Sequence, residues 1–218
     1  MRPLAGVILA AGASQRMGRP KAGLQHGGRT FFARVRDGLG AAALEPVVVV
    51  VGMHSDEVRR DPGGARVIVN PDPSRGQLSS LKLALRHLAA AGSGAVGVVV
   101  ALVDHPIVAP ETIAALVRSA HTGAQPILVP TYRGRRGHPV VFMRDMWTEL
   151  LDTPDHLGAR VVVRRDPSRV CEVAVDDPGI LVDVDTPADL HALRSVSSPH
   201  RREVAEDEQK PGSAKPRS

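Results

Sequence analysis

Residues 6–21 have the sequence GVILAAGASQRMGRPK, which joins a buried strand to a loop of small residues. Residues 7–9 are apolar and partly β-branched, which is typical of a strand buried on both faces. Residues 10–14 have almost no side chain, so their backbone N–H groups can approach a ligand. Three cationic side chains follow: Arg16, Arg19 and Lys21. Because oriented N–H groups and cations hold oxyanions, the stretch predicts a polyphosphate site at the end of a strand.

Two widespread nucleotide-binding motifs do not fit the spacing of this loop. A Walker A loop has four residues between its glycines and then Lys-Ser or Lys-Thr, whereas five residues separate Gly12 from Gly18 here. A dinucleotide fingerprint, G-x-G-x-x-G, requires glycine at the positions that Ser14 and Met17 occupy. The loop therefore predicts a different class of phosphate-binding protein.

The loop resembles the signature of the MobA-like nucleotidyltransferases, L-A-A-G-x-S-x-R-M-G-x-x-K, at every fixed position from Leu9 to Lys21. The resemblance implies a GT-A-type, Rossmann-like α/β domain that transfers a nucleoside monophosphate from a nucleoside triphosphate to a phosphate acceptor and releases pyrophosphate. It implies that Arg16 and Lys21 stabilise the α-phosphate and the leaving pyrophosphate. It also implies nucleotide contacts from the loop itself, at Leu9, Ala10, Ala11, Gly12 and Ser14.

The double alanine of the loop resembles the molybdenum cofactor cytidylyltransferase branch more than the guanylyltransferase branch, which more often has L-A-G-G. That branch implies CTP as donor, a phosphorylated pterin of the molybdopterin type as acceptor, and a molybdoenzyme as partner. A phosphate acceptor is ionised near neutral pH, so neither a protein nucleophile nor a general base is expected. Other nucleotides and sugar-phosphate acceptors stay open, as does a non-catalytic factor that carries the cofactor to a molybdoenzyme.

A metal site is expected where the most apolar strand, residues 96–103, ends in Asp104. A carboxylate at the carboxyl end of a central strand suits Mg²⁺ or Mn²⁺, because these cations take one or two carboxylates together with phosphate oxygens. The resemblance implies that Asp104 and Asp185 are the two ligands. Asp185 lies in residues 180–190, which predict a strand that carries Asp183 and Asp185 and then a last helix opened by Thr186-Pro187. Asp183 lies on the same face of that predicted strand and stays open as the second ligand, and a capping role is the alternative for each carboxylate.

Two further segments resemble substrate-binding motifs of the same family. Residues 70–85 predict a loop that leads into a helix, and the resemblance places Gln77, Ser79 and Ser80 on the nucleobase side, with helix capping as the alternative for each serine. Residues 132–142 predict a basic hairpin with the motif G-x-x-G-H-P-V-x-F. The resemblance implies contacts to the acceptor from three residues of this motif: Arg136, Gly137 and His138.

Composition and order of elements indicate the fold class. Hydrophobic residues make up 43% of the 218 residues but aromatic residues only 2%, so the core is built from Val, Leu, Ala and Ile. Strand and helix patterns alternate, which predicts a three-layer α/β fold with a mostly parallel central sheet and ligands at the carboxyl ends of its strands. We expect one nucleotidyltransferase domain over residues 1–194 and a disordered tail over residues 195–218, where the apolar periodicity ends.

Several function classes do not fit the composition. The net charge of +5 comes from 28 basic residues among 23 acidic ones, and few aromatics are present for base stacking, so nucleic acid is not expected as a partner. The longest apolar run, residues 95–103, is far shorter than the ~18 residues that span a bilayer. A single cysteine, Cys171, cannot form an internal disulfide and favours a reducing, cytoplasmic location.

Overall fold

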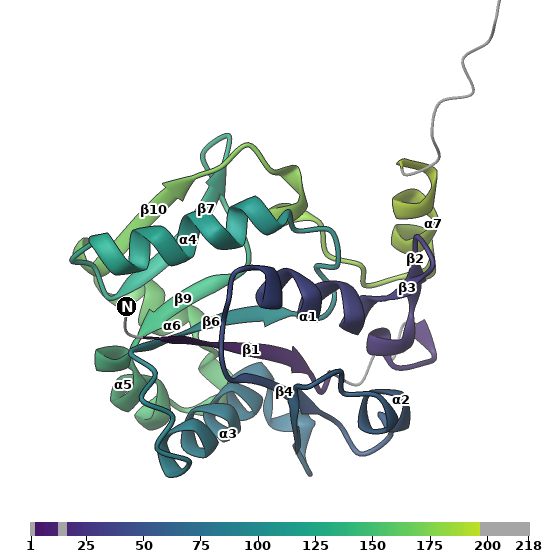
Figure 1. The fold of residues 1–218 in the computed structure, drawn as a ribbon, viewed down its shortest axis with the longest axis horizontal. Helices are drawn as coiled ribbons and strands as arrows, with labels where there is room; N and C mark the ends of the chain where they lie inside the picture. The colour runs from purple at the N-terminus through teal and green to yellow at the C-terminus, as the bar shows by residue number, and fades with distance from the viewer. Residues whose placement is uncertain (1–2, 13–16, 197–218) are drawn as a thin grey trace, which may run out of the picture.

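The computed structural model describes residues 3–12 and 17–196, and it has the three-layer α/β architecture that the sequence predicts (Figure 1). The main sheet has the strand order β10-β7-β9-β6-β1-β4-β5, with β8 paired to β7. The strands are β1 Leu4–Ala10, β2 Gln25–His26, β3 Arg29–Thr30, β4 Val47–Val51, β5 Arg66–Val69, β6 Gly97–Leu102, β7 Ile127–Tyr132, β8 Arg135–Arg136, β9 Val140–Met143 and β10 Val170–Ala174. The α-helices are α1 Phe31–Ala41, α2 Asp56–Arg60, α3 Gln77–Ala90, α4 Pro110–Thr122, α5 Trp147–Asp152, α6 Arg160–Arg165 and α7 Pro187–Val196.

The sheet is mostly parallel, as predicted. β1 pairs in parallel with β4 and β6, β4 with β5, and β7 with β10. β9 is antiparallel to both of its neighbours, β6 and β7. β6 lies at the centre of the strand order and all six of its residues are buried, which confirms the prediction from its apolar run. The carboxyl ends of β1, β4, β5 and β6 therefore meet at one edge of the sheet.

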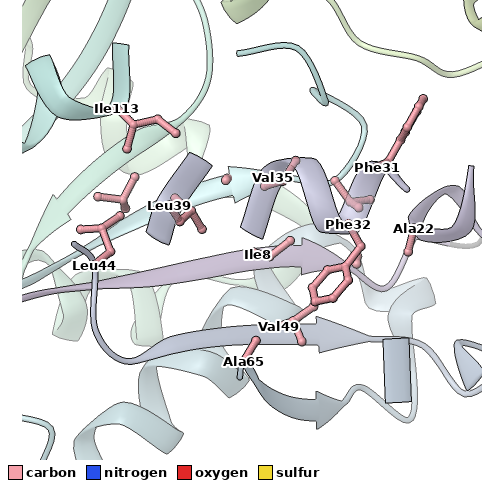
Figure 2. Packing of buried hydrophobic residues seen from close by; sticks show 14 of the residues in the cluster. Ile8, Ala22, Phe31, Phe32, Val35, Leu39, Leu44, Val49, Ala65 and Ile113 are labelled. Carbon is pink, nitrogen blue, oxygen red and sulfur yellow. The ribbon is translucent and has the colours of Figure 1, made fainter. Parts of the chain in front are cut away.

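One face of the sheet packs against α1 and α4. Figure 2 shows Ile8 of β1 and Val49 of β4 directed toward apolar side chains of α1. The helix begins at Phe31 because the Thr30 hydroxyl caps it, accepting a hydrogen bond of 3.1 Å from the Ala33 N–H. This packing holds the start of α1 beside the carboxyl end of β1.

The opposite face packs against α3, α5 and α6. Four buried leucines of α3 follow helical spacing, as the sequence predicts: Leu78, Leu81, Leu85 and Leu88. They contact the β1 and β4 side chains that alternate with the set shown in Figure 2, because successive residues of a strand point to opposite faces. α3 is thereby fixed with its first turn near the carboxyl ends of the strands.

Two predicted elements differ from the structure. The strand predicted to carry Asp183 and Asp185 is wrong: a short 3₁₀ helix, Pro178–Leu181, leads into an extended segment outside the sheet, whereas the helix predicted to open at Thr186-Pro187 is confirmed as α7. Its backbone bonds two different loops, since the Ile180 carbonyl accepts from the His138 N–H and the Val184 N–H donates to the Asp104 carbonyl, each at 3.0 Å. Residues 156–165 suit a helix or, at their three valines, a strand; Gly158, whose φ is +69°, divides them into the end of a 3₁₀ turn and α6.

The end of the predicted domain also shifts, because α7 continues to Val196, two residues into the segment predicted to be disordered. Residues 197–218 of the predicted tail lie outside the described residues. Among the described helices, none combines the length and the apolar character that a bilayer crossing requires.

Candidate active site

Three residues that the sequence singles out converge at the carboxyl edge of the sheet. The Lys21 ammonium donates a hydrogen bond of 2.9 Å to Asp104 Oδ2 and a second, very short one to Asp185 Oδ1. The Lys21 side chain is only 12% exposed, against 24% for Asp104 and 34% for Asp185. Residues far apart in the chain thus form one charged cluster, which we call the Lys21 cluster.

Asp104 reaches the cluster because it follows β6 by two residues, at a turn where the His105 N–H bonds the Leu102 carbonyl. Its carboxylate caps no helix: Oδ2 accepts from Lys21, and Oδ1 is buried without a hydrogen-bond partner among the described residues. A buried carboxylate oxygen without a donor is costly. The capping alternative for Asp104 is therefore not supported by its contacts.

Asp185 is held in place by the start of α7. The Asp189 carboxylate accepts hydrogen bonds from the Asp185 and Thr186 N–H groups at 3.1 and 2.7 Å, and the Asp189 N–H donates to the Thr186 hydroxyl at 3.2 Å. The side chain that caps α7 in this reciprocal arrangement is therefore that of Thr186, not that of Asp185. Asp183 is exposed, whereas Val184 between the two aspartates is buried. Of the two candidates, Asp185 is the one that contacts Lys21.

The cluster changes the protonation equilibria around it. Burial alone would lower the pKa of the Lys21 ammonium, but its contacts with Asp185 and Asp104 outweigh that effect and raise the pKa above the ordinary lysine value. Burial, with a smaller contribution from the neighbouring His105, lowers the pKa of His138 to about 4. The two imidazole rings lie 5.1 Å apart. Near pH 7 the cluster therefore holds a charged lysine, and His138 is neutral.

The donor set of the cluster fits Mg²⁺ or Mn²⁺. Asp104 and Asp185 both direct a carboxylate oxygen at the Lys21 ammonium, so their carboxylates converge on one point. The buried Asp104 Oδ1 has no hydrogen-bond donor in the described chain. No group of three or more His, Cys, Asp or Glu residues suited to a metal occurs within residues 3–12 and 17–196. Two carboxylates suit a hard cation whose remaining coordination positions are filled by phosphate oxygens and water, and not a cation whose ligands all come from the protein.

A pocket of about 510 Å³ lies over the sheet face that α3 covers, and the three residues of the Lys21 cluster are not among those that line it. Its apolar floor includes Leu9 and Leu102, the latter two residues before Asp104. Gln77, at the first position of α3, lines one wall. Arg136, Gly137 and His138 line the pocket as well. The structure thus brings residues predicted on the nucleobase side and on the acceptor side into one pocket.

The three residues predicted on the acceptor side have different surroundings. Arg136 forms an exposed ion pair with Glu172 at 2.7 Å, which a ligand can displace at little cost. Gly137 has no room for a side chain, since a Cβ there would lie 2.3 Å from the Ile180 carbonyl oxygen. The glycine therefore allows the segment that leads to Asp185 to pack closely.

Ser79 and Ser80 face away from this pocket. Both hydroxyls accept hydrogen bonds from the Asn70 side-chain amide, at 3.0 and 2.9 Å, and the Ser79 hydroxyl donates to the Gly76 carbonyl at 2.7 Å. The serines are buried and link the end of β5 to the start of α3. Their predicted role at the nucleobase stays a prediction, as these contacts account for both side chains by other means.

Part of the predicted phosphate loop lies outside the described residues, including Ser14 and the predicted catalytic residue Arg16. Ala10 and Ala11 are buried at the end of β1. A Cβ on Gly52 would lie 3.3 Å from the Ala11 carbonyl oxygen, so the end of β4 packs closely against the beginning of the loop. Gly12 is exposed. The loop roles of these residues remain predictions.

One wall of the pocket, residues 155–164, was not predicted from the sequence. Two exposed arginines of this wall, Arg160 and Arg164, lie one helical turn apart on α6. By contrast, the neighbouring Arg165 and Arg169 form ion pairs with Glu149 at 2.7 and 2.6 Å. The i, i+4 spacing of arginines was the available signal. It was missed because the run of valines between them left the secondary structure ambiguous.

A buried ion pair holds this wall against α3. The Lys82 ammonium is 2.8 Å from Asp155 Oδ1 and donates a 2.6 Å hydrogen bond to the Thr153 carbonyl. Arg75 lies 2.6 Å from the other oxygen of Asp155. The Lys82 ammonium, with a smaller contribution from Arg75, holds the pKa of the Asp155 carboxyl below its usual range against the opposing effect of burial. No pattern in the sequence joins these residues.

Comparisons with known proteins identify the family of the chain. The family model of the MobA-like NTP transferase domain matches residues 6–170. The chain is 33% identical to nicotine blue oxidoreductase of Paenarthrobacter nicotinovorans, over 86% of this chain and 95% of that protein. It is also 33% identical to a probable molybdenum cofactor guanylyltransferase of Mycobacterium avium, over 87% of this chain and 94% of the relative.

A solved structure shares the fold as well. It is Rv0371C of Mycobacterium tuberculosis H37Rv in complex with manganese, which superposes with a TM-score of 0.72 at 29% identity, over 88% of this chain and 98% of that one. The family match covers β1 to the beginning of β10, which includes the described ends of the loop, the strand that leads to Asp104 and the basic hairpin. This chain belongs to the MobA-like NTP transferase family.

Proposed function

We propose that this protein transfers a nucleoside monophosphate from a nucleoside triphosphate to the phosphate of a molybdopterin-type acceptor, in molybdenum cofactor biosynthesis. The observation that carries the proposal is the Lys21 cluster, in which a lysine and two carboxylates meet. Strand β6 connects the cluster to the pocket of about 510 Å³, since Leu102 lines the pocket and Asp104 follows two residues later. The name of the Mycobacterium avium relative supports the acceptor. A cytoplasmic location belongs to the same proposal.

In the proposed reaction an oxygen of the acceptor phosphate attacks the α-phosphorus in line. The bond between the α-phosphorus and the oxygen that bridges to the β-phosphorus breaks, and pyrophosphate leaves with the electron pair. Lys21 and Arg16 would stabilise the charge that develops on these oxygens. A divalent cation held by Asp104 and Asp185 would neutralise phosphate charge when it is bound. Positioning and charge neutralisation suffice, because the acceptor is already an anion.

The acceptor would lie against the basic hairpin. Arg136 supplies a cation there, and its exposed pair with Glu172 is easily exchanged for a phosphate. His138 is neutral near pH 7, because burial lowers its pKa to about 4, so it would contribute a hydrogen bond and not a charge. Gln77, on the other wall, would contact the nucleotide.

Two donors are proposed, and each has one observation in its favour. The L-A-A-G form of the loop favours CTP. The Mycobacterium avium relative, named as a probable guanylyltransferase, favours GTP. Because the walls of the pocket do not by themselves decide between the two bases, the donor is assigned by competition between CTP and GTP.

A redox function is the second candidate, since the Paenarthrobacter relative is named nicotine blue oxidoreductase and aligns over 95% of its length. Such a reaction requires an electron donor. The dinucleotide fingerprint that would bind NAD or NADP at the end of β1 is missing from the sequence there. The Lys21 cluster suits phosphates better than hydride transfer, so nucleotidyl transfer is preferred.

The test measures pyrophosphate release from CTP, GTP, ATP and UTP with Mg²⁺ or Mn²⁺. Acceptors are molybdopterin and a set of sugar phosphates, and oxidation of NADH and NADPH is followed in parallel. We expect release that requires both the metal and molybdopterin, with one of CTP or GTP strongly preferred. Release with a sugar phosphate alone would reassign the acceptor. Oxidation of a nicotinamide cofactor without pyrophosphate release would replace the proposal by the redox function.

A further inference from the structure

The Lys21 ammonium occupies the place where Asp104 and Asp185, the two proposed ligands, would hold a metal. Its ammonium is 2.9 Å from Asp104 Oδ2 and in direct contact with Asp185 Oδ1. The lysine side chain is 12% exposed, so its charge is largely withdrawn from water. An ammonium held by two carboxylates in this way is strongly bound, because the contacts combine hydrogen bonding with charge.

A divalent cation needs the same oxygens. Mg²⁺ and Mn²⁺ bind carboxylate oxygens at about 2.1 Å, well inside the space that the ammonium fills. The buried Asp104 Oδ1, which has no donor among the described residues, offers a first contact for an incoming cation. A cation on Oδ1 would still lie within about 5 Å of the ammonium, where like charges at low dielectric repel strongly.

The balance of charge points the same way. Asp104 and Asp185 together carry two negative charges, of which Lys21 neutralises one. A free divalent cation must displace the lysine from both carboxylates and brings no oxygen that accepts the ammonium in their place. A cation that arrives with a nucleoside triphosphate brings phosphate oxygens that accept the released ammonium.

We propose that Lys21 competes with the divalent cation for Asp104 and Asp185, so that the site takes up the metal together with the nucleotide and excludes the free ion. The Lys21 ammonium would thus bind the carboxylates first and the phosphates of the nucleotide afterwards. The inference rests on the proposed function, since it takes the metal and phosphate roles from it. It adds that metal and nucleotide bind with positive coupling that depends on Lys21.

The test uses Mn²⁺ alone as the probe and measures binding, not turnover. Free Mn²⁺ is followed by electron paramagnetic resonance during titration of the full chain, without nucleotide. The variants are Lys21→Met, which removes the charge at similar volume, and Lys21→Arg, which keeps it. Lys21→Gln is a second neutral variant in case the methionine impairs folding, and circular dichroism checks the fold of each.

We expect the neutral variants to bind Mn²⁺ at least about tenfold more tightly than the wild type, which corresponds to about 1.4 kcal/mol. Lys21→Arg should stay close to the wild type. Mn²⁺ should also raise the melting temperature of Lys21→Met more than that of the wild type, since ligand binding to the native state stabilises it. Equal or weaker Mn²⁺ binding by both neutral variants would overturn the competition.

Asp104→Asn separates failure of this inference from failure of the proposed function. If the metal site is as proposed, the double variant Lys21→Met/Asp104→Asn loses the tight Mn²⁺ binding, which supports the competition. If tight binding survives in the double variant, the cation lies elsewhere and the metal assignment in the proposed function falls with the inference. Unchanged Mn²⁺ affinity in Lys21→Met, together with metal-dependent turnover of the wild type, overturns the competition alone.

Discussion

Removing the Lys82 ammonium should destabilise the wall of the pocket. Lys82→Met keeps most of the aliphatic stem but loses the 2.8 Å pair with Asp155 and the 2.6 Å hydrogen bond to the Thr153 carbonyl. Both charged side chains are only 10% exposed. Breaking a buried pair costs about 3–5 kcal/mol, and because Arg75 still neutralises Asp155 at 2.6 Å we expect the lower end, about 3 kcal/mol.

Urea denaturation at pH 7 measures this loss, and a melting temperature lower by about 6–12 °C should accompany it in a chain of this size. Arg75→Met is the matched control: it removes the other cation from Asp155, but its side chain is 65% exposed, so the loss should stay below about 1 kcal/mol. A Lys82→Met variant as stable as the wild type would refute the argument from burial.

The pH dependence gives a second check on the same pair. The folded-state pKa of Asp155 lies below its ordinary value, mainly because of Lys82. A carboxyl with a depressed pKa stabilises the fold fully above its unfolded pKa of about 3.9, and that stabilisation is lost as the pH falls through the folded value. The stability difference between wild type and Lys82→Met should therefore be constant from about pH 5 to 8 and shrink below about pH 4. A difference that grows in acid would contradict this assignment.

Three further predictions concern the site and its frame. Asp104→Asn should abolish metal-dependent turnover, whereas the exposed Asp183→Asn should retain it; an inactive Asp183→Asn together with an active Asp185→Asn in a metal titration would reassign the second ligand. Arg136→Ala should raise the KM for the acceptor about tenfold and leave nucleotide affinity unchanged in calorimetry, so lost nucleotide binding would move this arginine to the other substrate. Asp177→Ala should cost about 2–3 kcal/mol in urea denaturation, because its carboxylate, in a residue only 7% exposed, accepts three hydrogen bonds; a cost under about 0.5 kcal/mol would show that water replaces them.

The central strands and their helices could be predicted because local pattern and tertiary environment agree. Val47–Val51 is a continuous β-branched run, which suits only a strand with both faces covered. The leucine spacing of Gln77–Ala90 likewise matches the face that the helix buries. Lys21 and Asp104 could be assigned to one site because both follow the carboxyl ends of neighbouring parallel strands.

What could not be predicted depends on contacts between distant segments. Residues 180–184 are rich in β-branched and apolar side chains, yet their backbone bonds two loops instead of a strand, and only that path carries Asp185 to Lys21. The wall at residues 155–164 also depends on a contact between distant segments, since Lys82 and Asp155 meet only after α3 has packed on the sheet. Side-chain partners of Ser79 and Ser80 also depended on β5, which supplies Asn70 at its end.

The most direct test of nucleotidyl transfer follows the α-phosphate. The enzyme is incubated with molybdopterin, Mg²⁺ and either CTP or GTP labelled at the α-phosphorus, and the products are separated and identified by mass spectrometry. The account predicts that the label joins the acceptor through a new phosphoanhydride bond, with one pyrophosphate released per transfer, and that Asp104→Asn forms no such product. Label recovered only as free nucleoside monophosphate or unreacted triphosphate, with an unmodified acceptor, would contradict it.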